Sequence, residues 1–532
     1  MRNFRLIIVV ILSIFLVECA KRGVPEGGPK DEDPPKLINA EPNENAINFK
    51  EKRIRLYFDE YIKLKEFRKQ IVVSPPIDKS FYSINPQSGA SKYIQIDIKK
   101  PLDENKTYVF NFGESIVDNN EGNKLPFFKY VFSTGEYVDS LSIKGNIMRS
   151  YDRKYESFIS TFLYPLDENF NDSIVFNGLP NYVGNTLDST NFEMTNLRKG
   201  KYMFLALKDE NNNYKFDPEF DKIGFIDFNL NLPTTDSLQI DLFKENIPFE
   251  SFRPFFEKEN KIGFPFKGSS EGVEIKLIDS IQRDFMITKN KETDTLNYWF
   301  KKFDYDTLYF KISKSNYSKT YKLKKQELEK DSLIVSSSIN SVLELEDQFK
   351  INSNIPLFSV DNEKISVLNK DSILVEFKTE LDKNKFDINF KFEVLPNDNY
   401  TINILPNAIK DFYNNSNDTI SYSFKTKSRS DYGILNLKIN DLKEYPVIVQ
   451  LLDNKESVVR EKKLNSIEDP CFFENLKPAN YFIRLIYDKN NNGIWDTGNF
   501  LNRIQPEKTF HYSEEIVVRA NWVLEEKISV NQ

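Results

Sequence analysis

The sequence has 532 residues, a formal net charge of −7 and interspersed acidic and basic side chains. This length predicts several domains, and the charge pattern provides no basic block for nucleic acid. One histidine and two cysteines exclude a histidine-cluster metal site and disfavour a Ser/His/Asp triad. Phe and Tyr dominate the 14% of aromatic residues and accompany many Ile, Asn and Asp residues, which is typical of an all-β protein with Asx-rich turns.

Residues 1–18 have the pattern of a signal peptide. Arg2 and Arg5 precede an apolar run that is too short to cross about 30 Å of hydrocarbon as a helix. The run ends in the tetrapeptide LVEC, which resembles a bacterial lipobox and predicts that Cys19 is lipidated. An ordinary Sec signal is the alternative interpretation, because Glu18 stands where lipoboxes usually carry a small residue.

A segment rich in Gly, Pro and charged side chains follows, over residues 19–36. This composition cannot bury a core and predicts a lipidated tether that reaches roughly 50 Å at full stretch. With Cys19 lipidated, Cys471 has no partner for a disulfide, and we expect it to be a small buried apolar residue.

Short alternating runs at the spacing of a β-sandwich begin after the tether and predict a first sandwich over residues 37–137. The runs are residues 54–58, 94–98, 108–112 and 130–134. A second sandwich is expected over residues 138–245, where a turn at 196–202 leads into a strand and an Asp/Asn-rich loop follows.

Residues 246–340 are predicted to form a middle β domain. Its expected strands are residues 274–277, 296–300 and 307–312. Residues 324–330 are the best candidate in the chain for a short helix.

The remainder of the chain repeats the first two units. Tyr108 and Tyr400 have the same separation in sequence as Tyr130 and Tyr422, which predicts that residues 341–428 repeat the first sandwich. Residues 429–532 repeat the second, with eight identities at one constant spacing. The chain is therefore predicted to be an internally duplicated pair of β-sandwiches around a middle unit.

The first part of the chain resembles Bacteroidota outer-membrane lipoproteins with an SbsA-type Ig-like domain. The motifs that carry the resemblance are CAKRG at 19–23, PEGGPKD at 25–31, PP at 34–35, IRLYFDE at 54–60, VSPP at 73–76, NFG at 111–113 and IVDNN at 116–120. The resemblance covers residues 19–137 and implies an Ig-like sandwich on an envelope lipoprotein, with no reaction. The acidic run at 30–33 is similar to the export tag of surface lipoproteins in this phylum, although it lies further from Cys19 than such tags usually do.

The repeated second unit is similar to the B-type (CnaB) repeats of Gram-positive adhesins and to prealbumin-like domains. Its shared pattern is Asn-Leu, a following Tyr, and then an Asp-x-Asn loop. The resemblance implies sandwiches that serve as stalks and spacers, a fold that hosts many functions.

Two loops carry oxygen side chains at positions 1, 3, 5 and 9, which resembles the spacing of an EF-hand calcium loop. Gly493 occupies position 6 of the second loop, but Phe220 and Asn499 stand where the bidentate Glu would be, and Asp221 compensates in part. The pattern predicts weak calcium sites, with a self-bonded Asx turn as the alternative. The candidate ligands are Asp209, Asn211, Asn213, Asp217, Asp488, Asn490, Asn492 and Asp496.

Two further chemistries, sugar stacking and glycoside hydrolysis, have less support in the sequence. The run Tyr298-Trp299-Phe300 is either a stacking platform for sugar rings or a core strand. A glycosidase needs a pair of carboxylates, and nothing in the sequence singles out such a pair.

The sequence therefore predicts a non-enzymatic lipoprotein, anchored through Cys19 to the outer membrane, with the cell surface favoured over the periplasmic leaflet. We expect a structural or protein-binding accessory subunit that contacts outer-membrane proteins of an envelope complex. It should need no cofactor, apart from calcium if the loops bind it. A surface glycan-binding lipoprotein is the alternative, and a hydrolase is less favoured.

Overall fold

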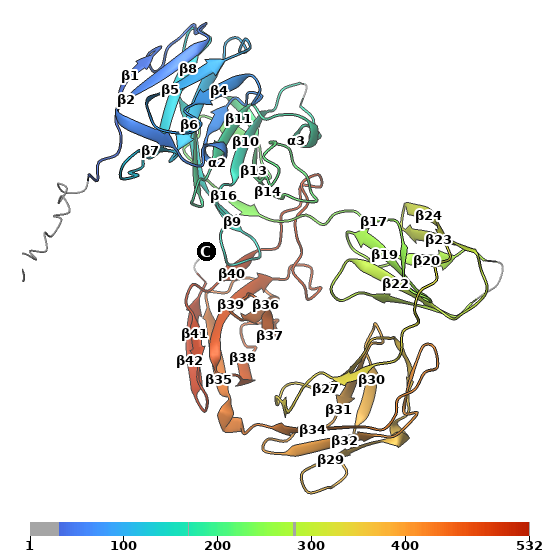
Figure 1. Ribbon diagram of the computed structural model, residues 1–532. Helices are drawn as coiled ribbons and strands as arrows, with labels where there is room; N and C mark the ends of the chain where they lie inside the picture. Colours follow the sequence, from blue (N-terminus) through green and yellow to red (C-terminus); the bar gives the residue numbers. More distant parts are fainter. Residues whose placement is uncertain (1–30, 169, 280–282, 531–532) are drawn as a thin grey trace, which may run out of the picture.

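The computed structural model describes residues 31–168, 170–279 and 283–530. Cys19 and most of the expected signal and tether lie outside these residues. These residues fold into five β-sandwiches in tandem, which confirms the predicted all-β, duplicated architecture (Figure 1). No helix within the described ranges is long and apolar enough to cross a membrane.

The first sandwich has its core between one five-stranded and one three-stranded sheet. Ile54, Leu56 and Phe58 alternate along one strand and are buried, because successive side chains of a strand point to opposite faces. The larger sheet contains β1 (Leu37–Glu41), β2 (Arg53–Leu64), β5 (Ser91–Ile98), β4 (Tyr82–Asn85) and β7 (Ile116–Asp118). The smaller contains β3 (Val72–Ser74), β6 (Thr107–Gly113) and β8 (Phe128–Ser133), and a helical turn, α2 (Phe67–Gln70), precedes β3.

The second sandwich has a core on each side of its larger sheet, because β13 (Gly200–Lys208) is apolar on both faces. Phe204 and Ala206 face the smaller sheet, whereas Met203, Leu205 and Leu207 belong to a second core on the outside, which we call the outer core. The larger sheet also contains β11 (Tyr182–Asn185), β10 (Ser160–Pro165), β14 (Lys222–Phe225) and β15 (Leu230–Leu232). The smaller contains β12 (Asn191–Leu197), β9 (Leu141–Arg149) and β16 (Ser237–Leu242), and α3 is Ile174–Asn177.

The third sandwich lies within the expected middle domain. One sheet contains β17 (Glu250–Ser251), β18 (Phe255–Lys258), β19 (Lys261–Lys267), β22 (Thr295–Phe300) and β21 (Phe285–Lys289); the other contains β20 (Glu274–Leu277), β23 (Thr307–Lys314) and β24 (Tyr317–Lys324). The helix predicted at 324–330 is wrong, because β24 ends at Lys324 and the chain continues as coil. Its only large apolar side chain, Leu328, is exposed, and so short an isolated helix is marginal without packing.

The fourth and fifth sandwiches complete the chain. The fourth contains β25 (Val335–Ser337), β26 (Val342–Leu343), β27 (Phe349–Ser353), β28 (Leu357–Val360), β29 (Ile365–Leu368), β30 (Lys378–Leu381), β31 (Asp387–Lys391), β32 (Asn399–Ile404), β33 (Ile409–Asp411) and β34 (Ile420–Thr426). The fifth contains β35 (Gly433–Asn440), β36 (Val447–Leu452), β37 (Val458–Leu464), β38 (Cys471–Leu476), β39 (Ala479–Tyr487), β40 (Thr509–His511), β41 (Ile516–Val518) and β42 (Val523–Ser529).

The duplication extends to individual hydrogen bonds. In the first sandwich the hydroxyl of Tyr108 accepts the backbone N–H of Asp103 at 3.1 Å. In the fourth, the hydroxyl of Tyr400 accepts the N–H of Leu395 at 2.9 Å, and in both copies the donor lies five positions ahead of the tyrosine. Both contacts resemble the tyrosine corner that fixes the strand connections of Ig-like sandwiches.

The joint between the two sandwiches of each pair is also duplicated. Arg198, in the turn before β13, donates to the carbonyl of Asn105 in the first sandwich at 2.8 Å. Lys477 holds the equivalent position in the fifth sandwich and forms an ion pair with Glu344 at 3.4 Å. Each pair is therefore joined through the same turn.

Candidate functional site

The first Asx loop satisfies its backbone with its own carboxylates. The buried Asp209 accepts the N–H groups of Asn213 at 3.2 Å and Tyr214 at 2.7 Å. Asn213 and Asp217 each accept the N–H two residues further along, from Lys215 and Glu219 respectively. These are Asx-turn contacts, which leave Asn211 exposed at the tip.

The second Asx loop repeats this arrangement, and here a lysine side chain also contacts the first carboxylate of the loop. Asp488, fully buried, accepts the N–H groups of Asn492 and Gly493, both at 2.9 Å, and Lys463 Nζ at 2.6 Å. Burial raises the pKa of Asp488, but the hydrogen bonds from Lys463 and the loop backbone outweigh this and hold it below its usual value. The side-chain amides of Asn490 and Asn492 both donate to Asp496.

A carboxylate outside the nine-residue pattern closes each loop. Asp221 accepts the N–H groups of Glu210 at 3.0 Å and Asp217 at 2.7 Å. Glu507 does the same in the second copy, where it accepts the N–H groups of Lys489 at 2.8 Å and Asp496 at 3.2 Å. Burial raises the pKa of both carboxyls. The sequence comparison did not reveal Glu507, because extra residues before it break the constant separation between the two repeats.

The structure therefore places the eight predicted ligands in two matched loops and shows what their oxygens contact. Among the described residues, no three His, Cys, Asp or Glu side chains are grouped so as to hold a metal ion. The loops would have to bind calcium through Asn side chains and backbone carbonyls as well as Asp, and calcium binding stays a prediction.

Both loops also contribute to the outer core of the second sandwich. Tyr214 and Phe216 enter it from the first loop, and Trp495 enters it from the second. Directly after the second loop, residues 497–505 lie on the second sandwich; we call them the docking segment. Its Phe500 is 0% exposed and packs 5.5 Å from the ring of Phe225. Both Asx loops thus contribute side chains to the core at which the fifth sandwich contacts the second.

Polar contacts hold the docking segment in place. Phe500 N–H donates to Glu245, and Arg503 pairs with Asp172. Gln505 donates to the carbonyl of Phe225 at 2.9 Å. Leu501, next to Phe500, is 57% exposed, so the segment presents one apolar side chain inward and the next to solvent.

A second set of contacts lies at the start of the β9–β10 connection. The buried Arg484 donates to the carbonyl of Tyr151 at 3.0 Å and stacks 3.7 Å over its ring. Arg153 stacks 3.5 Å over Phe482. Together with the docking segment these contacts form what we call the closing interface, which brings the fifth sandwich back against the second (Figure 1).

His511 lies beside this interface. Its Nδ1 is buried and has no hydrogen-bond partner within the part of the chain that the structure describes. Burial first, and the Arg484 guanidinium second, lower the pKa of His511 to about 4. The ring is therefore neutral at pH 7.

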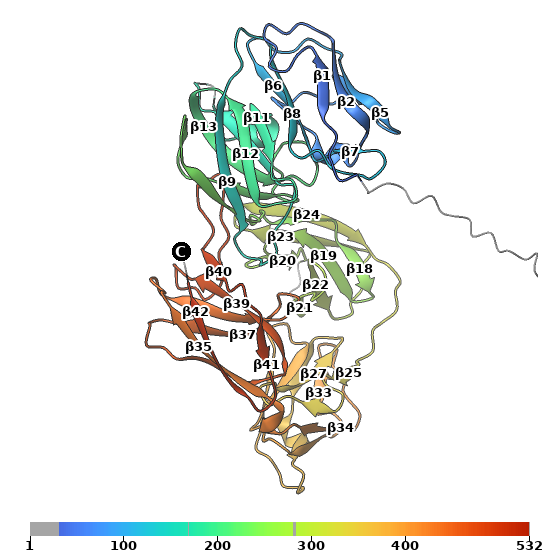
Figure 2. The same cartoon turned by 90° about the vertical axis from the view of Figure 1, so that its left-hand side faces the viewer.

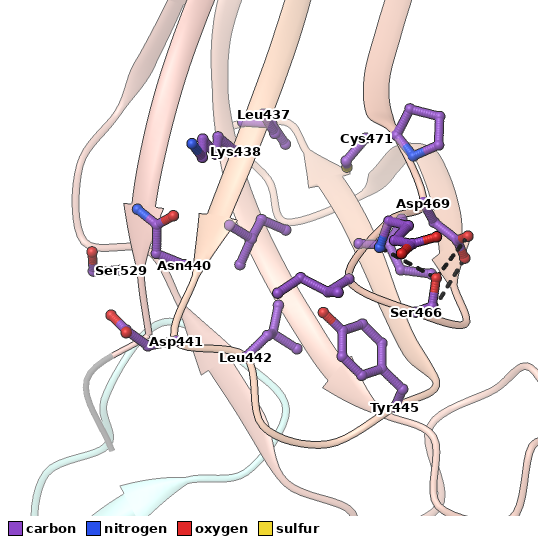
Figure 3. Close-up of a pocket in the computed structure, with 15 residues that line it drawn as sticks. Leu437, Lys438, Asn440, Asp441, Leu442, Tyr445, Ser466, Asp469, Cys471 and Ser529 are labelled. Atoms are coloured by element: carbon purple, nitrogen blue, oxygen red, sulfur yellow. Dashed lines mark hydrogen bonds between the residues drawn. The ribbon is translucent and has the colours of Figure 1, made fainter.

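A cleft of about 650 Å³ opens at one end of the fifth sandwich (Figure 3). Cys471 lines it, and burial raises the pKa of this thiol to about 11. Asp441 and Asp469 lie on opposite sides of the cleft. Asp469 accepts the N–H groups of Asn465 and Ser466, which hold its pKa below the usual range. It is a turn-forming carboxylate rather than a general acid, which would need a raised pKa.

Of the two alternatives for residues 298–300, the core strand is confirmed and the stacking platform is wrong. Trp299 is 0% exposed, and Tyr298 and Phe300 are buried in the third sandwich. Trp299 packs with Ile355 and Phe412 of the fourth sandwich, so the run is core and joint between sandwiches.

Residues 31–134 match the family model of a bacterial Ig-like domain, which confirms the expected Ig-like domain at the start of the chain. None of the curated proteins matches the sequence. Similar solved structures include the major pilin subunit BcpA of Bacillus cereus, with 10% identity over 74% of this chain and 99% of the pilin and a TM-score of 0.15. The S-layer protein rSbsC(31-844) has 9% identity over 90% of this chain and 66% of its own, with a TM-score of 0.14. Scores this low carry no argument about function.

Proposed function

We propose that the chain is a non-enzymatic structural or protein-binding subunit of an envelope complex, held at the outer membrane by lipidated Cys19 on the cell-surface side. The closing interface is the observation that carries the proposal. A stalk needs contacts only between consecutive domains, whereas here the last sandwich returns to the second (Figure 1).

Closure converts a string of domains into a frame with fixed relative positions. Burying the Phe500 side chain contributes about 1.5–3 kcal/mol, and the buried hydrogen bonds of Arg484 add specificity. The third and fourth sandwiches are joined through Trp299, and Tyr413 donates to the carbonyl of Asn260 at 2.8 Å. Such a frame presents several surfaces at once, as an accessory subunit requires.

The chemistry of the most reactive residue types agrees with this role. A nucleophilic cysteine needs a lowered pKa, and a catalytic histidine needs one near 7. The pKa of Cys471 is raised instead of lowered, and the pKa of His511 is lowered away from 7.

The test combines closure with complex formation in the native host. Tagged wild-type protein and a Phe500→Asp variant are purified from gently solubilised membranes, with Leu501→Asp as the matched control. We expect the Phe500 variant to lose both the co-purifying proteins and complementation of a deletion strain, and the control to retain both. Full complementation by a Phe500→Asp protein that small-angle scattering shows to be open would contradict the proposal.

A further inference from the structure

The outer face of the first sandwich carries a row of planar side chains. Along β2 the even-numbered residues from Ile54 to Ile62 include four core residues, so the odd-numbered residues point outward. β5 pairs antiparallel with β2 and supplies the facing row. The planar outward residues are Arg53, Arg55, Tyr57, Tyr61, Tyr93, Gln95 and Asp97. Their sheet lies on the side of the first sandwich that is turned away from the second (Figure 2).

Three cross-strand pairs hold these groups in order. Arg53 Nε donates to Asp97 at 2.7 Å, and Arg55 Nε donates to Gln95 at 3.1 Å. Tyr57 faces Tyr93 with ring centroids 5.9 Å apart. The side chains are therefore positioned before any ligand arrives, which lowers the entropy cost of binding.

The aromatic groups remain accessible. Tyr93 is 42% exposed and Tyr61 is 55% exposed. Where β1, β2 and β5 pair, the two basic residues Arg53 and Arg55 are matched by the two acidic residues Glu41 and Asp97. A neutral polar ligand suits such a face better than an anionic membrane or nucleic acid does.

The duplicate copy shows that the fold does not require this row. Lys350 pairs with Asn389 where the first sandwich has Arg53 and Asp97, and Asn352 pairs with Asp387 at the next outward position. When this correspondence is continued along the sequence, Asn354 takes the position of Tyr57, and Lys385 takes the position of Tyr93. The buried Ile54–Ile96 pair of the first sandwich corresponds to the buried Ile351–Ile388 pair of the fourth, whereas the outward residues beside it differ.

We propose that this face binds a neutral, extended β-1,4-linked glycan. A pyranose ring has an apolar C–H face and a rim of hydroxyls, so it stacks on Tyr57, Tyr93 or Tyr61 while its hydroxyls bond to neighbouring side chains. From Arg53 to Tyr57 the paired strand extends roughly 13 Å, and Tyr61 lies beyond an irregularity in the β2–β5 register, so the face accommodates more than one sugar ring. A β-1,4-linked chain is a flat ribbon and matches a face that has no groove.

The test is calorimetric titration of the full chain in detergent with cellohexaose and with chitohexaose. We expect at least one hexasaccharide to bind. The double variant Tyr57→Asn with Tyr93→Lys, which installs the residues of the duplicate copy, should weaken binding at least tenfold. The control Tyr309→Asn removes an exposed strand tyrosine of the third sandwich and should leave binding unchanged.

Thermal melting shows whether the double variant is folded, and Tyr61→Asn replaces it if it is not. Absence of binding to both hexasaccharides would overturn the proposal, as would equal binding by wild type and variant. Tyrosine-dependent binding to phosphatidylglycerol vesicles, without binding to either sugar, would assign the face to a lipid surface instead.

Discussion

Phe500 of the fifth sandwich packs against Phe225 of the second, with ring centroids 5.5 Å apart. The two sandwiches are separated in sequence by two complete sandwiches, yet this contact is as buried as any core contact within one sandwich. This contact makes the closing interface part of the fold, and its contribution to holding the two sandwiches together can be measured.

Phe500→Ala should open the closing interface while the five sandwiches stay folded. Removing a buried Phe side chain costs about 3–5 kcal/mol, and separation of two sandwiches is the easiest way to relieve the cavity. Small-angle scattering should show a larger radius of gyration. Leu501→Ala, one residue away and exposed, should leave the radius unchanged; equal radii for wild type and both variants would show that other contacts suffice.

His511 makes stability fall on mild acidification. Its pKa is lowered to about 4 in the folded chain, below the usual histidine value of about 6.5, so the unfolded chain binds more protons between these values. Stability therefore decreases as the pH falls from 6.5 towards 4. The melting temperature of wild type should drop further between pH 7 and pH 5 than that of His511→Gln. His511 is the only histidine of the sequence, and both proteins keep all their carboxylates, so the difference in pH dependence between them reports the titration of His511. Identical pH dependence would contradict the prediction.

The duplication was visible in the sequence because its causes are local. Tyr108 and Tyr400 each bond to a backbone group five positions away, and the Asx loops bond to themselves. Such contacts preserve spacing, and spacing is what a sequence comparison detects. The Ig-like domain and the sandwich fold were predictable for the same reason.

The closing interface was not predictable, because nothing local distinguishes its residues. Phe500 resembles any core aromatic residue, and Arg484 lies in a strand whose apolar sequence predicts burial. The tyrosine row of the first sandwich was missed for a similar reason: Tyr57 and Tyr93 look like ordinary strand residues until β2 and β5 are paired. The sequence also left a platform and a core strand open for Trp299, because it does not show what packs on this side chain.

Cys19→Ala should release the protein from membranes. The apolar run before Cys19 is too short to span the hydrocarbon region, so loss of the predicted lipid should remove the membrane attachment. The variant should appear in the soluble periplasmic or medium fraction, whereas wild type should sediment with membranes after a high-salt wash. A variant that still sediments would show that lipidation is not the anchor.

Calcium should raise the melting temperature if the Asx loops bind it, because a ligand that binds only the native state stabilises it by mass action. In the second loop the metal must compete with Lys463, whose Nζ lies 2.6 Å from Asp488. Lys463→Met should therefore increase the gain in melting temperature on adding millimolar calcium, because it removes the competing cation.

The matching loss-of-binding variant is Asp488→Asn with Asp496→Asn, which should abolish the calcium-dependent gain of the fifth sandwich. Asp469→Asn is the control, since Asp469 forms a similar backbone-bonded turn outside both loops. Because both loops adjoin the closing interface, calcium should also make the Phe500→Ala variant more compact in scattering. Equal melting temperatures in chelator and in calcium, for wild type and for Lys463→Met, would show that the loops are self-bonded turns whose carboxylates serve only their own backbone.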